Sequence, residues 1–412
     1  MNLPAFLNKD IFKSSTLLFS GSVLSYFILF LGSIPILRIY GPEEYGHYAA
    51  LLSLTSILGI PSTGQIHHAL FLEEDAAEIS KMLSVVLLFF IVTVILGLAG
   101  LAIYDLISGK VPWIYYVVVP VFQIIGTLQT LIISFAIKSQ GFRQISIYKI
   151  VNAILYVLVG VSIGLVSPKL IGLIAGYVFS YSLALIYLIQ TISGARAIYA
   201  TRLDFELKNF IKYKKYIQFT LPGELVNTTM TQVPILWVNH FFGAANTGYF
   251  KFATKILSIP VDLIANSLGA IFKNKASLEL KSAGHAKESF QGTFVLLAVS
   301  GLIVFTGLFL TVDTLIPWLW GDEWASASTL LKTLLILYFF KYSIGPLTYI
   351  AQLASKQKEM FLINILVAVS ILTGFFISYY FSFELIPTLW TYTCFFCFSS
   401  LITLMYSRKF SQ

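Results

Sequence analysis

The chain contains little charge and little cysteine. Asp, Glu, Lys and Arg make up 11% of its 412 residues, against about 25% in an average soluble protein. Hydrophobic residues make up 57%, and the mean hydropathy is +0.83. So few polar side chains exclude a soluble globular protein. The sequence has instead a series of long apolar runs, each near the ~20 residues that a helix needs to cross a bilayer. These runs indicate a polytopic membrane protein.

Motifs for covalent chemistry are also missing. The sequence has no Gly-rich phosphate loop with a Walker-type Lys, so nothing in it predicts ATP binding. Cys394 and Cys397 lie in the apolar run "TCFFCFSS" without a second pair, so we interpret them as packing residues. His67 and His68 diverge by about 100° on a helix and are not expected to share a face. We therefore expect no enzyme activity, no catalytic residue, no metal and no cofactor.

The apolar runs predict twelve transmembrane helices. They lie near 14–37, 44–69, 82–104, 112–137, 146–166, 169–192, 216–241, 247–272, 289–312, 327–354, 360–381 and 384–406. Backbone polar groups must be paired in lipid, and the runs lack the alternation of barrel strands, so we expect an all-α bundle. No cleavable signal peptide is expected, because the first run begins a full-length helix.

The distribution of Lys and Arg predicts the orientation. If the N-terminus is cytoplasmic, the outer loops hold only Arg38, Lys110 and Lys169, and the inner segments hold nearly all the others. Because Lys and Arg concentrate in cytoplasmic loops, both termini are expected in the cytoplasm. One inner loop, "FLEEDAAEISK" (71–81), is acidic, but acidic residues contribute little to this rule. The net charge of +8 is then mostly a topology signal, and we expect no nucleic-acid partner.

Two segments predict an internal repeat. One begins at Arg38, "RIYGPEEYGHYAALLSL", and the other at His240, "HFFGAANTGYFKFATKI". The corner glycines Gly41 and Gly46 match Gly243 and Gly248, and the prolines Pro35 and Pro61 match Pro234 and Pro260. Four landmarks in the same order predict that each half begins with the same kinked helix pair and the same corner.

The longest polar segment divides the predicted helices six and six. We therefore expect an N-terminal six-helix lobe (1–192), a basic cytoplasmic linker (193–215) and a C-terminal six-helix lobe (216–412). Both lobes have the same orientation, so they form a parallel repeat about the membrane normal, around a central cavity. Because two lobes lie in one chain, a monomer is sufficient.

The corner motif carries a family resemblance. "LRIYGPEEYGHYAALLSL" resembles the first-loop signature of the O-antigen and polysaccharide repeat-unit flippases, in the multidrug/oligosaccharidyl-lipid/polysaccharide exporter superfamily. The segments 213–272 and 320–340 are similar to later helices of the same family. The resemblance implies a flippase that moves undecaprenyl-pyrophosphate-linked oligosaccharide repeat units to the periplasmic leaflet of a bacterial inner membrane. Lipid-linked oligosaccharide and membrane lipids are the implied partners, with the polysaccharide polymerase and chain-length regulator as further candidates.

Charged side chains inside the predicted helices are the candidate substrate contacts, because a diphosphate cannot cross hydrocarbon unaided. Lys251, Lys255 and Asp262 share one helical face, and Lys341 lies near mid-membrane. We expect Lys255, Lys341, Lys251 and Arg38 to contact the anionic cargo. The alternatives are snorkelling for Lys251, an ion pair with another helix for Lys341, and capping of a helix C-terminus for Arg38.

Two acids are candidates for ion coupling. Glu224 and Asp262 are expected at similar depth in neighbouring helices. Either could bind H⁺ or Na⁺ and couple alternating access to the gradient, because burial raises the affinity of a carboxylate for protons. The alternative is that one of them neutralises Lys255 or Lys341.

Two other functions are alternatives to a flippase. A cation-coupled drug exporter of the same superfamily would share the fold, but Lys255 and Lys341 would repel cationic drugs. A polymerase or ligase would need a large outer loop, and the longest outer loop is expected near 313–325. The exporter is therefore the alternative that remains.

Overall fold

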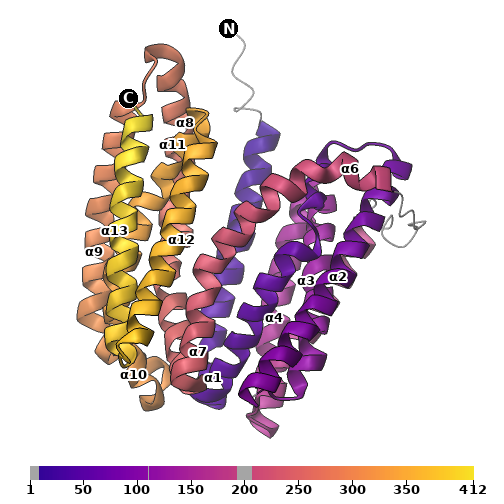
Figure 1. The fold of residues 1–412 in the computed structure, drawn as a ribbon, viewed down its shortest axis with the longest axis vertical. Helices are drawn as coiled ribbons and strands as arrows, with labels where there is room; N and C mark the ends of the chain where they lie inside the picture. Colours follow the sequence, from indigo (N-terminus) through magenta and orange to yellow (C-terminus); the bar gives the residue numbers. More distant parts are fainter. Residues whose placement is uncertain (1–8, 110, 193–206) are drawn as a thin grey trace. The chain divides into compact units, whose positions relative to one another are not determined.

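The computed structural model describes residues 9–109, 111–192 and 207–412. Its regular elements are helices (Figure 1), and ten helical stretches among the described residues are long and apolar enough to cross a membrane. The chain is therefore an all-α, multi-pass membrane protein, which confirms the predicted class. The predicted linker falls, over 193–206, outside the described residues.

The helices follow the apolar runs closely. The first half contains α1 (Lys9–Ser62), η2 (Ile66–Phe71), α2 (Ala76–Ser108), α3 (Ile114–Lys138), α4 (Phe142–Val166) and α5 (Leu170–Thr191). The second half contains α6 (Leu207–Lys215), η4 (Tyr216–Thr220), α7 (Leu221–Pro260), η5 (Val261–Ala265), α8 (Asn266–Ala283), α9 (Lys287–Trp320), η6 (Asp322–Trp324), α10 (Ala325–Ile344), η7 (Gly345–Tyr349), α11 (Ile350–Leu353), α12 (Gln357–Tyr380) and α13 (Leu385–Phe410).

Several predicted boundaries are wrong, and at two of them the cause is a backbone turn. The helix expected over 44–69 ends at Ser62, and the 3₁₀ segment η2 follows after Gly64 and Gln65, which both adopt left-handed φ values. The outer loop expected near 313–325 is mostly helix, because α9 continues to Trp320 and breaks only at Gly321, whose φ is 100°. Backbone turns decide both ends, and hydropathy does not register them.

The two predicted corners have the same backbone conformation. Gly41 interrupts α1 at φ 68° and ψ 175°, and Gly243 interrupts α7 at φ 85° and ψ 174°. This region of φ/ψ space is essentially restricted to glycine. Each long element is thus two helices joined at a glycine, and the matching prolines do not mark the breaks. The total of twelve crossings stays a prediction.

Contacts divide the chain into two compact units. The first contains the described residues of Met1–Tyr40 and His47–Thr228, and the second contains Gly41–Gly46 and Thr229–Gln412. The corner that follows Tyr40 therefore groups with the second unit. The bounds predicted for the lobes and the linker stay a prediction.

In the first unit, the first half of α1 runs parallel to α4. A Cβ on Gly32 would lie 2.1 Å from a methyl of Val157, and a Cβ on Gly164 would lie 2.7 Å from a methyl of Ile39. The Tyr40 hydroxyl donates a 2.7 Å hydrogen bond to the carbonyl of Gly160. Small residues allow this approach, as is usual between membrane helices.

In the second unit, the first half of α7 runs parallel to α12. The rings of Trp237 and Phe375 lie 5.3 Å apart, and those of Phe241 and Tyr379 lie 5.4 Å apart. The first helix of each unit thus packs in parallel against a later helix at the matching position in the order. This supports the internal repeat that the corner glycines predict.

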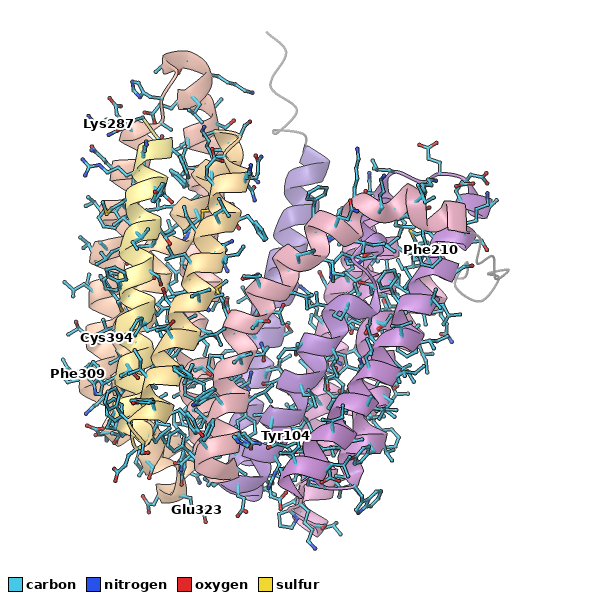
Figure 2. The ribbon with its side chains drawn as sticks, viewed as in Figure 1. Tyr104, Phe210, Lys287, Phe309, Glu323 and Cys394 are labelled. Atoms are coloured by element: carbon cyan, nitrogen blue, oxygen red, sulfur yellow. The ribbon has the colours of Figure 1, made fainter. Side chains whose placement is uncertain are left out.

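The outer faces of the helices are apolar. Figure 2 shows Phe309 on α9 and Cys394 on α13 at the edge of their unit; Phe309 is 50% exposed, and Cys394 is exposed. Such faces suit contact with lipid. The interpretation of Cys394 as a packing residue is therefore wrong.

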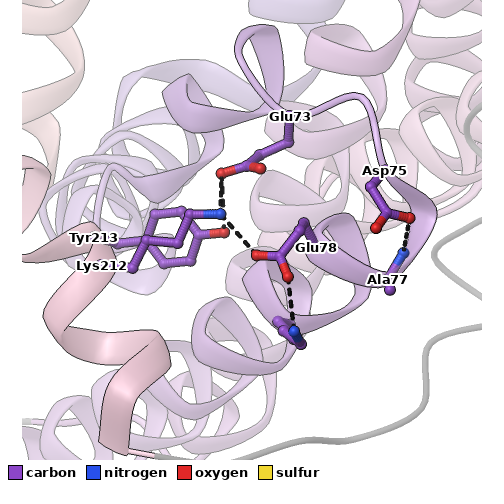
Figure 3. Close-up of polar contacts among 7 residues, drawn as sticks. Glu73, Asp75, Ala77, Glu78, Lys212 and Tyr213 are labelled. Carbon is purple, nitrogen blue, oxygen red and sulfur yellow. Dashed lines mark hydrogen bonds and ion pairs between the residues drawn. The ribbon is translucent and has the colours of Figure 1, made fainter.

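The acidic loop has basic partners far along the chain. The ammonium of Lys212 on α6 lies 2.6 Å from the Glu73 carboxylate and 2.7 Å from that of Glu78 (Figure 3). Lys81 pairs with Glu78 at 2.7 Å, and Lys138 donates a hydrogen bond to the Glu73 carbonyl. The loop and the basic helix α6 therefore lie on the same side of the membrane, which explains an acidic segment where Lys and Arg prevail.

Candidate functional site

The charged residues predicted on the eighth helix form a stripe on the second half of α7. Lys251 and Lys255 are partly buried and lie close enough to repel each other. Ser258 and then Asp262 continue the same face. Asp262 lies in the π-helical turn η5, directly after Pro260. A proline leaves a carbonyl of the preceding turn without its N–H partner, and π turns inside helices are frequent at functional sites.

Helix α10 faces this stripe with a third lysine. Lys341 is partly buried, and its ammonium lies 5.4 Å from the centre of the Tyr338 ring. The Tyr338 side chain is hydrogen-bonded to Thr254 on α7. The charges of Asp262 and Lys341 attract each other, although no direct ion pair joins these two described residues. The structure thus brings Lys251, Lys255, Asp262 and Lys341 onto one pair of facing helix surfaces.

Lys332 lies on the same helix as Lys341 but has different partners. Its ammonium pairs with the Asp313 carboxylate and lies 5.0 Å from the centre of the Phe309 ring. It is therefore engaged by α9, whereas Lys341 faces α7 and η5.

The other two predicted residues belong to the first unit. Arg38 is exposed, three residues before the Gly41 corner. Glu224 is exposed on α7 and lines a cavity. The described contacts therefore do not gather all six predicted residues into one site.

The cavity that contains Glu224 has a volume of about 700 Å³. It extends along α3 from Phe122 to Ile137, in the last turn of that helix. Its lining also includes residues of α1, η2, the turn between them, and α5: Leu52, Thr55, Ser56, Gly59, Ile60, Thr63, Gln65, His67, His68, Phe71 and Tyr177. The remaining lining residues on α3 are Gln123, Gly126, Gln129, Thr130, Ile133 and Ser134. The lining thus combines polar and aromatic side chains.

The two histidines differ from their prediction. Their rings lie 4.2 Å apart in η2, and both line the cavity. His67 is buried, and its Nδ1 is 3.1 Å from the Thr63 hydroxyl. Burial, with a smaller effect of His68, lowers the pKa of His67 to about 4. The imidazole is therefore neutral near pH 7.

The sequence interpretation missed Gln123. This side chain is only 1% exposed, and neither its amide nitrogen nor its amide oxygen has a hydrogen-bond partner among the described residues. The sequence did contain a signal: Gln123, Thr127, Thr130 and Ser134 recur at helical spacing in an otherwise apolar span. Polar stripes inside membrane helices usually face protein or water rather than lipid.

The described residues contain no group of three or more His, Cys, Asp and Glu that could hold a metal ion. Cys394 and Cys397 are free thiols.

The fold is one that known membrane transporters adopt. The structure is similar to the lipid II flippase MurJ in an inward closed conformation, with a TM-score of 0.69 and 16% identity over 94% of this chain and 87% of that one. It is also similar to an outward-facing multidrug resistance MATE family transporter, with a TM-score of 0.62 and 13% identity over 96% of this chain and 95% of that one. At these identities the likeness concerns the fold.

The sequence assigns the family. Residues 36–329 match the model of the polysaccharide biosynthesis protein family, and the chain belongs to this family. It is also 24% identical over 147 residues to the teichuronic acid biosynthesis protein TuaB of Bacillus subtilis (strain 168). That alignment covers 34% of this chain and 29% of TuaB, so the match spans under a third of the curated relative.

Proposed function

We propose that the chain is a flippase for undecaprenyl-pyrophosphate-linked oligosaccharide repeat units. It would move them from the cytoplasmic to the periplasmic leaflet of a bacterial inner membrane, for O-antigen or a related surface polysaccharide. Membership in a polysaccharide biosynthesis family supports a glycan as the cargo. The fold shared with a lipid II flippase supports transport of a lipid-linked molecule. The protein then needs no covalent chemistry and no cofactor beyond an ion gradient.

The observation that carries the proposal is the facing arrangement of Lys255 and Lys341. Ammonium groups inside membrane helices are costly and generally serve a function. Neither lysine forms a direct ion pair with a described acid, so both charges can bind an anion. A lysine suits a diphosphate, because its ammonium is a point charge with three donors. Lys251 lies one turn from Lys255 and continues the cationic surface, and Arg38 stays a candidate contact in the first unit.

The position of Asp262 suggests how an ion gradient drives the cycle. Asp262 and a bound diphosphate would compete for the positive charge of Lys341. Binding of H⁺ or Na⁺ at Asp262 would therefore change the affinity of Lys341 for the cargo, and cargo binding would change the affinity of Asp262 for the ion by the same factor, because coupling between two ligands is reciprocal. Glu224 is the second candidate for this role. Asp262→Asn and Glu224→Gln variants test it: transport that no longer responds to the gradient is expected, and unchanged gradient dependence in both excludes it.

The experiment that tests the flippase uses a strain without the gene. The lipid-linked repeat unit is labelled, and its leaflet and the surface glycan are measured. We expect the deletion strain to accumulate the unit in the cytoplasmic leaflet. The wild type and Lys332→Ala should restore transport to the periplasmic leaflet, and Lys255→Ala or Lys341→Ala should give at least tenfold less transport than the wild type. Lys332 is the matched control, because it lies on the same helix as Lys341. Normal leaflet distribution in the deletion strain excludes the function.

The alternative is a cation-coupled drug exporter, which the likeness to MATE family transporters favours. Normal glycan with altered drug tolerance in the deletion strain would support it. The two lysines argue against it, because they would repel cationic drugs. Interaction with the polysaccharide polymerase and chain-length regulator, and action as a monomer, are part of the flippase proposal.

A further inference from the structure

The cavity in the first unit differs in chemistry from the lysine stripe. Its described lining residues include no Lys or Arg, and Glu224 is the carboxylate among them. The polar groups are mostly amides, hydroxyls and imidazoles: Gln65, Gln123, Gln129, Thr55, Ser56, Thr63, Thr130, Ser134, His67 and His68. A diphosphate would find no cation there. The cavity therefore suits an uncharged polar ligand.

Gln123 points independently to such a ligand. Its amide is almost completely buried, and both polar atoms lack a hydrogen-bond partner among the described residues. A buried amide without partners is unfavourable, and a group bound in the cavity would complete its hydrogen bonds. The amide offers both a donor and an acceptor, so a group that can accept and donate side by side fits it best.

The aromatic lining residues indicate which class of uncharged polar ligand fits the cavity. Phe122 and Tyr177 both line the cavity, with ring centres 4.2 Å apart. Neighbouring hydroxyls on a sugar ring match an amide, and the C–H face of the ring packs against an aromatic side chain. Ligand sites commonly combine apolar walls with a few polar groups that fix orientation.

We propose that this cavity is a sugar-binding subsite that holds part of the uncharged oligosaccharide. The inference rests on the proposed flippase function and names the part of the cargo that the first unit recognises. Gln123 hydrogen-bonds vicinal hydroxyls, Thr130 adds a hydroxyl about two turns along the same face of α3, and the partly buried Tyr177, packed on Phe122, covers a sugar face.

The test is equilibrium binding to the purified full-length protein in lipid nanodiscs. The probes are the free repeat-unit oligosaccharide, released by mild acid from the lipid-linked pool of the host, and inorganic pyrophosphate. Gln123→Leu keeps the side-chain size and removes both polar atoms, and Thr130→Val removes one hydroxyl. We expect Gln123→Leu to weaken oligosaccharide binding at least tenfold and Thr130→Val to weaken it severalfold, with pyrophosphate binding unchanged.

A control variant distinguishes a specific loss of oligosaccharide binding from a general effect of replacing a glutamine. Gln291→Leu makes the same replacement at an exposed position of α9, and both probes should bind it as they bind the wild type. Wild-type oligosaccharide affinity in Gln123→Leu overturns the subsite, and so does equal loss of both probes in both cavity variants. If wild-type protein binds no free oligosaccharide but still moves the labelled lipid-linked unit in the leaflet assay, the subsite fails while the flippase function stands.

Discussion

Gly46 and Gly248 pack backbone against backbone where the two corners meet. A Cβ on Gly46 would lie 1.8 Å from the carbonyl oxygen of Ala244, and a Cβ on Gly248 would lie 2.0 Å from that of Pro42. The contact is reciprocal: the second glycine of each corner lies on the loop of the other corner. The repeated motif therefore specifies two surfaces that fit each other.

Alanine at either glycine should weaken this contact strongly. A Cβ so close to a backbone oxygen forces the backbone to move, and overpacking of this kind costs about 1–3 kcal/mol or more. We expect Gly46→Ala and Gly248→Ala each to lower the thermal midpoint in detergent. The double variant should lose less than the sum, because both changes open the same contact. Gly100→Ala is the control, since a Cβ there meets nothing within 4 Å; equal effects at Gly100 and Gly46 would contradict the prediction.

Alanine at the first glycine of each corner should act through the backbone itself. Gly41 and Gly243 have positive φ with ψ near 180°, a conformation that costs other residues about 1–3 kcal/mol. Nothing lies within 4 Å of a Cβ on Gly243, so at that position the strain is purely conformational. Chemical denaturation of Gly243→Ala measures it, and D-alanine at the same position, introduced by semisynthesis, should restore stability. Stability equal to the wild type in Gly243→Ala would exclude this conformation.

His67 should make stability depend on acid pH. Its pKa is lowered to about 4 in the folded protein from 6.5 when unfolded. The unfolded chain therefore binds the proton first, so stability is full above pH 6.5 and falls as the pH drops towards 4. The total loss is about 3 kcal/mol. Urea unfolding in detergent between pH 7 and pH 4 should show this slope in the wild type and in His285→Gln, and a flatter one in His67→Gln. If stability falls with pH as steeply in His67→Gln as in the wild type, groups other than His67 cause the pH dependence.

The contact between Lys212 and Glu73 predicts membrane topology. Residues that touch across the chain must lie on one side of the membrane, so cysteines at positions 74 and 214 should react from the same side. In a background with Cys394 and Cys397 changed to alanine, we expect Glu74→Cys and Lys214→Cys to react with an impermeant maleimide only after lysis. Lys169→Cys should react in intact cells. Labelling of positions 74 and 214 from opposite sides would exclude the contact.

Hydropathy predicted the helices well, because each apolar run has the length that a bilayer requires. It could not predict the turn after Ser62, where Gln65 adopts a left-handed conformation and its amide reaches the carbonyl of Ile60 at 3.1 Å. Hydropathy also predicted that the 289–312 helix ends too early. Asp313 and Pro317 are residues typical of loops, yet α9 continues through both of them. Local backbone geometry, rather than polarity, decided both ends.

The candidate site was predictable where charge stands out in an apolar helix. Lys255, Asp262 and Lys341 are visible in the sequence for that reason, and helical periodicity placed the first two on one face. The cavity was not predicted, because Gln123 and Thr130 carry no charge and a span with a few such residues still counts as apolar. The partners of the acidic loop could not be predicted, because Lys212 lies far from Glu73 in the sequence and charge alone does not choose among many lysines.

The parallel pairing of α1 with α4 sets an order for biogenesis. The glycine face around Gly32 receives Val157, and that residue is synthesised only after the second half of α1, α2 and α3. Until then the first helix lies in the membrane without its partner, held by lipid alone or by an insertion factor. The pairing of α7 with α12 repeats the same delay in the second half. A truncation between α3 and α4 would therefore insert normally and yet leave a bundle that cannot close.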